Sequence, residues 1–217
     1  EPIDPTVTVM KICRLTFFTI LLFATSVTPG FQIDERKTTA VKDFEFQLPT
    51  GLSRVAWRRR IPLDNPMTPG RVALGEALYF DKRLSIDGTV SCATCHDPAN
   101  AFTDHGTVAI GVSTKTGTRN APTILNAMFS DRLFWDGRVG SLEEQAKQPL
   151  TNSFEMGMRN NTAVVERVRG FPEYRKEFRR VFKREGVTID TIAKAIAAGA
   201  DVVITYHAKD VARWLNP

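Results

Sequence analysis

The cysteines Cys92 and Cys95, with His96 directly after them, are the residues whose types and spacing are best suited to chemistry. A C-x-x-C-H run is the covalent attachment signature of a c-type haem. Each thiol can form a thioether with one haem vinyl group, and the histidine is then placed to bind the iron from the proximal side. The motif therefore predicts one covalent haem c, with His96 as a ligand of the haem iron.

Two other kinds of site contain a C-x-x-C pair. A structural zinc site needs four ligands, usually from two such pairs, whereas this sequence has one pair. A redox-active pair should lie at the end of a strand in a βαβ unit, and no such pattern is visible here. The third cysteine, Cys13, lies in a segment that we expect to be removed, so we expect no structural disulfide.

The composition is that of a globular protein. The chain has 217 residues, of which 42% are hydrophobic, and this is enough for one domain with a core plus tails. A formal net charge of +5 is weak evidence for nucleic-acid binding, and no basic stretch with interleaved aromatic residues supports it. We therefore expect no nucleic-acid partner, while a docking face for an acidic redox protein is compatible with the charge.

The N-terminal residues 1–30 have the pattern of an export signal. Met10 is followed by the basic residues Lys11 and Arg14, by a short apolar run over residues 15–27, and by small and turn-forming residues. This order indicates a secretory signal peptide that begins at Met10. An uncleaved anchor is the alternative, although the apolar run is shorter than the ~20 residues that a membrane span requires. We expect a periplasmic protein, because c-type haem is attached outside the bacterial cytoplasm.

Helix signals predominate around the haem motif. Residues 31–60 are mixed and charged, and we interpret them as an extended leader. Thr68 and Pro69 fit the N-cap and first position of a helix that ends near Phe80. Further helices are expected over residues 163–169, 171–182 and 188–198. The fold class that we expect is all-α, a cytochrome c-type haem domain with long loops.

Several sequence blocks occur in an order that resembles a known family. They are residues 66–69, 74–81, 83–85, 91–98, 101–104, 117–123, 134–138, 141–146 and 149–152. Together they are similar to the N-terminal haem domain of the bacterial di-haem cytochrome c peroxidase and MauG family, from about residue 61 to about residue 198. The resemblance implies a haem enzyme whose substrate is hydrogen peroxide and whose electrons come from a small redox protein or cytochrome.

The resemblance also implies individual site residues. In the family, the tryptophan of the F-W-D-G-R block lies between the two haems and takes part in electron transfer, and it corresponds to Trp135. A glutamine and a glutamate on the peroxide side of the haem correspond to Gln145 and Glu155. A carboxylate there can move a proton between the peroxide oxygens, and an amide can hold the polarised O–O bond. Asn120 corresponds to a calcium ligand between the haem domains. Taken alone, Glu155, Gln145 and Asn120 would be interpreted as a surface carboxylate, an exposed helix residue and a loop asparagine.

At one position the sequence departs from the family pattern. Members whose N-terminal haem starts with two histidine ligands carry the second histidine some sixteen residues after the motif, where this chain has Val112. The resemblance therefore implies an iron that is open to peroxide from the start, as in MauG-like members. Four other side chains could ligate the iron, although the histidine among them is more commonly a loop residue and the methionines more commonly fill apolar space. They are His105, Met128, Met156 and Met158.

The C-terminal residues 199–217 also diverge, because the family pattern continues into a second haem domain with its own C-x-x-C-H run. Residues 198–215 are instead similar to the C-terminal segment of porphobilinogen synthase, and we interpret them as a junction or truncation. A second haem domain is therefore expected to be absent, and a second haem subunit or a second copy of the chain would be the partner.

Two functions are consistent with these observations. The first is an exported peroxidase that reduces hydrogen peroxide to water, represented here by the N-terminal half of a di-haem cytochrome c peroxidase. The second is a mono-haem electron-transfer cytochrome c without catalysis, in which a sixth ligand closes the iron. The optical spectrum of the ferric protein distinguishes them, since an open haem is high-spin and a six-coordinate haem is low-spin.

Overall fold

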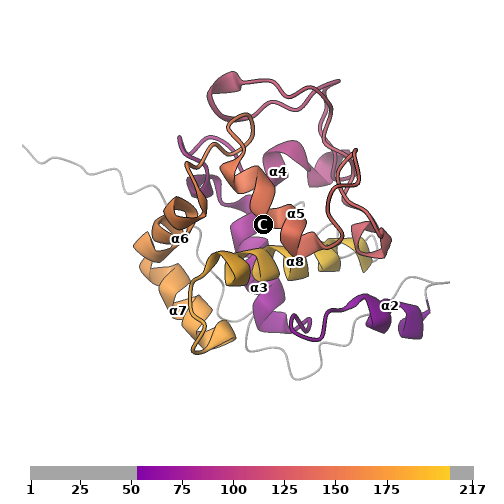
Figure 1. Ribbon diagram of the computed structural model, residues 1–217, viewed down its shortest axis with the longest axis vertical. Helices are drawn as coiled ribbons and strands as arrows, with labels where there is room; N and C mark the ends of the chain where they lie inside the picture. Colours follow the sequence, from indigo (N-terminus) through magenta and orange to yellow (C-terminus); the bar gives the residue numbers. More distant parts are fainter. Residues whose placement is uncertain (1–52, 206–217) are drawn as a thin grey trace, which may run out of the picture. The chain divides into compact units, whose positions relative to one another are not determined.

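The computed structural model describes residues 53–205, and side-chain environments within residues 53–200. The expected signal peptide, most of the expected leader and residues 206–217 lie outside this part of the chain. The elements are, in chain order (Figure 1), α2 (Arg54–Arg60), α3 (Pro69–Phe80), η2 (Lys82–Leu84), α4 (Cys92–Cys95), η3 (Pro98–Asn100), η4 (Val112–Thr114), η5 (Ala127–Phe129), α5 (Leu142–Thr151), α6 (Asn161–Gly170), α7 (Pro172–Phe182) and α8 (Ile189–Thr205).

The expected all-α class with long loops is confirmed. Within residues 53–205, the extended pairings are three isolated bridges, which join Asp97 to Thr103, Ile110 to Thr116 and Leu133 to Val139. The longest loop region runs from α4 to α5 and contains only short 3-10 turns. In addition, no helix in the described part of the chain is long and apolar enough to cross a bilayer.

α3 begins and ends where its sequence signals place it. The Thr68 side chain accepts a hydrogen bond from the Arg71 N–H at 3.3 Å, and Pro69 lies in the first turn. Asp81, with extended backbone, ends the helix. Residues 74–79 are all buried, so α3 runs through the interior rather than along the surface.

α8 crosses α3 at a pair of glycines. A Cβ atom added to Gly75 would lie 1.9 Å from the Ala195 carbonyl oxygen, and one added to Gly199 would lie 2.7 Å from the Gly75 carbonyl carbon. Glycine is required at this crossing because backbone meets backbone. α8 also packs against α5 (Figure 1), so the last helix contacts the two helices that flank the haem motif in sequence.

The main core lies among these helices and the α6–α7 pair. Phe178 and Phe182 of α7 stack with their ring centroids 5.7 Å apart, and they pack with residues of α3 and α8. Fully buried members of this core include Leu74, Leu78, Leu84, Leu150, Val164, Val168, Tyr174, Phe178 and Ile192. The core therefore forms beside the haem motif and supports the elements that carry it.

Two expected boundaries differ from the structure. Part of the expected extended leader is helical: Ser53 caps α2 by accepting the Ala56 N–H at 3.4 Å, and Trp57 is buried against Val72 and Met128. The C-terminal boundary expected at residue 198 is crossed by α8, which continues unbroken to Thr205. Burial of Trp57 explains the first difference.

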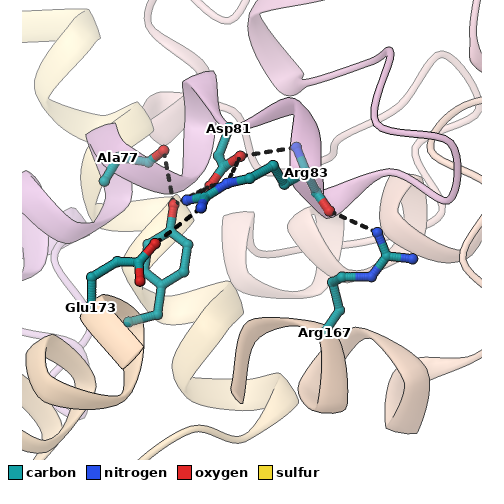
Figure 2. A network of polar contacts seen from close by, with 6 residues as sticks. Ala77, Asp81, Arg83, Arg167 and Glu173 are labelled. Carbon is teal, nitrogen blue, oxygen red and sulfur yellow. Dashed lines mark hydrogen bonds and ion pairs between the residues drawn. The ribbon is translucent and has the colours of Figure 1, made fainter. Parts of the chain in front are cut away.

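A polar network joins the end of α3 to α6 and α7 (Figure 2). The Arg83 guanidinium donates to Asp81 Oδ2 at 2.6 Å and to Glu173 Oε1 at 3.0 Å, while the Tyr174 hydroxyl donates to Asp81 Oδ2 at 2.7 Å. Burial alone would raise the pKa of Asp81, but the hydrogen bonds from Arg83 and Tyr174 outweigh it and lower this pKa. Arg167 donates to the Arg83 carbonyl oxygen at 3.1 Å. The segment before the haem motif is therefore tied to two helices.

Candidate haem site

The two motif cysteines lie on α4, a single helical turn. The Ser91 N–H donates to Thr94 Oγ1 at 3.0 Å at the start of the turn, and the His96 N–H donates to the Cys92 carbonyl oxygen at 2.9 Å at its end. Residues three apart are neighbours on a helix surface, so the two sulfurs lie on adjacent positions. Burial raises the pKa of Cys92 to about 12 and that of Cys95 to about 11, which leaves both as uncharged thiols at neutral pH.

His96 is held through its backbone and through its ring. Its carbonyl oxygen accepts a hydrogen bond from the Tyr79 hydroxyl, and its ring Nδ1 lies 3.3 Å from the Phe102 carbonyl oxygen. Because a carbonyl oxygen can only accept, this hydrogen bond requires the proton on Nδ1 and leaves the Nε2 lone pair for a metal. Burial lowers the pKa of the ring, with the carbonyl groups of Phe102 and Pro122 acting in the opposite direction. The ring is thus held in its neutral, ligating form.

These features fit a c-type haem. Attachment needs two unpaired thiols, and Cys92 and Cys95 are both free cysteines. Iron ligation needs a neutral imidazole with an available nitrogen, which the hydrogen bond of His96 provides. A cavity of about 440 Å³ opens beside α4 and is lined by Thr94, by residues of the preceding segment 87–90 and by residues within the loop 104–114. Cys92, Cys95 and His96 are therefore the residues that would hold the haem.

The loop that presents the Phe102 carbonyl has an unusual backbone. Ala101 and Phe102 have φ values of 51° and 57°, in the left-handed region that residues other than glycine rarely adopt. The Phe102 side chain is buried. The Thr103 hydroxyl donates to the Ala121 carbonyl oxygen, and the Ala121 N–H donates to Asp104 Oδ2 at 2.8 Å. These contacts hold the strained turn and so fix the direction of its carbonyl toward the motif histidine.

Trp135 and Asn120 are in direct contact. Trp135 Nε1 donates to the Asn120 carbonyl oxygen at 2.9 Å, and the tryptophan is 59% exposed. Asn120 directly precedes Ala121, which is bonded to the turn that carries Phe102. Hydrogen bonds and short backbone segments therefore connect the exposed indole with the ring of His96.

A calcium ligand role for Asn120 stays a prediction. The Asn120 carbonyl oxygen already accepts the Trp135 N–H. Across residues 53–200, no group of three or more His, Cys, Asp or Glu side chains lies close enough together to hold a metal ion. The expectation rests on the family resemblance alone.

Glu155 lies close to the motif cysteines. After burial, its negative charge is among the causes that raise the pKa of Cys92 and of Cys95. Burial raises the pKa of Glu155 itself, while the Arg138 charge and a 2.8 Å hydrogen bond from Asn152 act against this rise. Glu155 is thus a partly buried carboxyl group beside the haem attachment site and is more readily protonated than an exposed glutamate.

Gln145 lies on α5, seven residues before Asn152. Residues seven apart return to the same side of a helix, so Gln145 shares a face with Asn152, whereas Ala146 and Leu150 are buried. Within the described part of the chain no hydrogen bond joins Gln145 to Glu155. The role of Gln145 on the peroxide side of the haem stays a prediction.

Comparison with known proteins identifies the family to which the chain belongs. The family described as di-haem cytochrome c peroxidase matches residues 69–213, which is well over half of the chain. The chain belongs to the di-haem cytochrome c peroxidase family. The match continues past residue 198, so the residues that we expected to diverge up to residue 213 fall within it.

Individual relatives agree with this assignment. The methylamine utilization protein MauG of Methylorubrum extorquens is 46% identical over 124 residues, covering 57% of this chain and 35% of the relative. The cytochrome c551 peroxidase of Nitrosomonas europaea is 39% identical over 151 residues, covering 70% of this chain and 45% of the relative. Among solved structures, the chain is similar to the crystal structure of a MauG-like protein associated with microbial copper homeostasis, with a TM-score of 0.67 and 34% sequence identity. The match covers 79% of this chain and 50% of that protein. The chain thus spans less than half the length of these two curated relatives.

The structure also places the alternative iron ligands in this di-haem peroxidase domain. Val112, at the position of the second histidine of some members, is buried, and its N–H donates to the Glu155 carbonyl oxygen at 2.9 Å. His105 is bonded to Asp97 at 2.8 Å and is mostly exposed, as expected of a loop histidine. The three methionines are buried among core residues, as expected of apolar filler; they are Met128, Met156 and Met158.

Two residues that support the site were not identified from the sequence. Asn152 hydrogen-bonds to Glu155, and Gly111 allows the backbone before Val112 to approach Phe154, since a Cβ there would lie 1.9 Å from its carbonyl oxygen. A helix-ending asparagine three residues before Glu155 was an available signal for the first. The second depends on a contact between distant segments, which no local pattern indicates.

Proposed function

We propose that the chain is an exported c-type haem protein that reduces hydrogen peroxide to water with electrons from a redox partner. The observation that carries the proposal is the partly buried Glu155 carboxyl group, which lies beside the cysteines of the haem motif with a raised pKa. A bound haem c would supply the iron at which peroxide accepts electrons. Because the chain spans less than half of its curated relatives, activity of this chain by itself is part of the proposal.

Glu155 is assigned the proton transfers. Each hydrogen peroxide molecule takes up two electrons and two protons and yields two water molecules. The Glu155 carboxylate accepts the proton of the oxygen that binds first, and the resulting carboxylic acid returns it to the oxygen that leaves. The raised pKa of Glu155 suits both the uptake and the return of the proton, because a group that titrates closer to the working pH can accept and release a proton more readily. Gln145, on the helix face that leads to Asn152, would orient the peroxide.

Trp135 is assigned the electron relay. Its exposed indole offers a contact to an external donor, and its hydrogen bond to the Asn120 carbonyl oxygen begins the series of contacts that reaches His96. Electrons from a small redox protein or cytochrome would enter there. A second haem subunit, a second copy of the chain, and a calcium at Asn120 belong to the proposal as partners. The signal-like residues 1–30 support the periplasmic location that is part of the proposal.

Stopped-flow mixing of the haem-loaded protein with hydrogen peroxide tests this assignment. Glu155→Gln should slow the optical change of the haem by about two orders of magnitude or more, the usual contribution of a positioned acid–base group. Glu144→Gln, an exposed carboxyl group on α5, is the matched control and should leave the rate unchanged. A rate that Glu155→Gln does not alter would remove its role, and a low-spin protein that does not react with peroxide would favour the electron-carrier function.

A further inference from the structure

Asn152 lies at the C-terminal end of α5, where the turn that contains Glu155 begins. Its N–H donates to the Gln148 carbonyl oxygen at 3.0 Å and closes the helix. Its own carbonyl oxygen accepts the N–H groups of Glu155, at 3.1 Å, and of Gly157, at 2.9 Å. The backbone on both sides of Asn152 is therefore fixed, and its side chain starts from a defined position.

The amide group of Asn152 has only one orientation that satisfies its neighbours. Its Oδ1 accepts the Phe154 N–H at 2.9 Å, and its Nδ2 donates to Glu155 Oε1 at 2.8 Å. A flipped amide would direct N–H groups at a backbone N–H and an oxygen at the carboxylate, so both contacts would become repulsive. The donor end of the side chain must therefore face Glu155.

The other groups around Glu155 have different effects. From the loop before α5, Arg138 faces it with a positive charge, which its own contacts with Asp136 and Gln148 hold in place. Lys115 reaches the same turn by donating to the Ser153 carbonyl oxygen at 3.2 Å. The thiols of Cys92 and Cys95 on α4 face it as well and become uncharged thioethers once haem is attached. Asn152 is thus the neutral group that makes a directed contact with the carboxylate.

We propose that Asn152 is a positioning residue for Glu155, which holds Oε1 in place and leaves Oε2 as the oxygen that exchanges a proton with the substrate. Among residues 53–200, Oε2 receives no hydrogen bond. The inference rests on the proposed role of Glu155 in peroxide reduction. The contact also stabilises the ionised carboxylate against the effect of burial, so its removal should move the titration of Glu155 to higher pH.

Two variants of the haem-loaded full chain test the proposal. Asn152→Ala removes the donor. Asn152→Asp keeps the acceptor for the Phe154 N–H, and with it the turn, but places a carboxylate oxygen against Glu155. Asn160→Ala is the matched control, because Asn160 caps α6 by accepting the Ala163 N–H at 2.9 Å, and no hydrogen bond in the described part of the chain joins it to Glu155.

The measurement is an infrared titration of the Glu155 carboxyl band, assigned by its loss in Glu155→Gln. The band should titrate at higher pH in both Asn152 variants, most in Asn152→Asp, and at the original pH in Asn160→Ala. The pH at which the peroxide reaction reaches half its maximal rate should move by the same amount. At a pH below the titration, a shift of one pKa unit lowers the ionised fraction about tenfold.

The outcomes separate this proposal from the proposed function. An unchanged Glu155 titration in both Asn152 variants would overturn the positioning role, whatever the rate of the peroxide reaction. A shifted band in a protein that never reacts with peroxide would support the positioning role and refute the peroxidase assignment. Equal shifts in Asn160→Ala would indicate a general loss of structure and would overturn the specific role of Asn152.

Discussion

The spacing of Cys92 and Cys95 leads to the simplest residue-level prediction. Replacing both with alanine should abolish the haem band that survives denaturing electrophoresis, because only this pair has attachment spacing. Cys13→Ala is the matched control and should keep the band. Mass spectrometry of the unchanged protein should give the mass of one added haem, and a persisting band in the double variant would contradict the assignment.

Arg83 should contribute strongly to stability, because it neutralises a buried carboxylate. The Asp81 side chain is 3% exposed, and Arg83 also stacks on the Phe171 ring at 4.0 Å from its centroid. Arg83→Met should lower the free energy of unfolding by about 3 kcal/mol, the scale for removing one partner of a buried ion pair. Lys82→Met, an exposed neighbour, should change it little, and urea unfolding followed by circular dichroism measures both.

The pH dependence of this stability has a defined sign. The folded pKa of Asp81 is lowered from its ordinary value of 3.8, so its contribution is present above that value and is lost as the pH falls through the lower folded value. In Arg83→Met, burial would dominate and raise the folded pKa of Asp81 above 3.8, so Asp81 would destabilise the fold at neutral pH, and this part of the acid-induced loss of stability should disappear or reverse. Acid unfolding curves that coincide for the two proteins would contradict this account.

Individual residues also mark the limit of what the sequence could predict. The haem motif was identifiable because the two attachment cysteines and the ligating histidine fall within five consecutive positions. The tautomer of His96 was not, since the proton on Nδ1 depends on the Phe102 carbonyl, whose direction comes from two consecutive left-handed residues. Alanine and phenylalanine carry no local signal for that backbone, and only contacts with the segment around Ala121 hold it.

At the scale of elements, the α3–α8 crossing should be the least tolerant helix contact to substitution. Gly75→Ala would place a Cβ atom 1.9 Å from a backbone oxygen of α8. The variant should lose about 2 kcal/mol or more of folding stability, since overpacking outweighs the roughly 1 kcal/mol that alanine gains over glycine in a helix. Calorimetry would measure the shift in melting temperature.

The control for that prediction is Gly170→Ala in α6. A Cβ atom at Gly170 would meet no atom within 4 Å, so only the helix-propensity gain remains and stability should hold or rise slightly. Equal melting temperatures for Gly75→Ala and Gly170→Ala would mean that the crossing can relax, contrary to expectation.

The helices with clear start signals or apolar periodicity in the sequence were predicted with nearly correct bounds. α3 has a Thr-Pro start, and its bounds agree with the sequence-based ones. α6 and α7 also lie where they were expected. α2 was missed because its stability comes from a tertiary contact, the packing of Trp57 on Val72 and Met128. The length of α8 was underestimated because the sequence departs from the family blocks near residue 198, although the helix continues to Thr205.

At the scale of the whole molecule, the expected signal peptide is open to a direct test. Residues 11–30 combine two basic residues with a short apolar run, so expression with an export system should yield a mature chain that starts near residue 30. Edman sequencing of periplasmic protein measures this. Changing Lys11 and Arg14 to glutamate should reduce export, whereas changing Lys37 and Lys42 should not. Recovery of the intact N-terminus in membranes would favour an anchor instead.

The glycine crossing has a consequence for the order of events during biosynthesis. Gly75 and Gly199 are separated by most of the domain, and their contact encloses the haem motif within one long loop of chain. In a polypeptide that emerges from its N-terminus, Cys92 and Cys95 appear well before Gly199, and the loop cannot close until then. The two cysteines, which are half-buried once the domain has folded, are thus fully accessible for an interval. The fold thereby leaves time for haem to be joined to the chain before the last helix closes the domain.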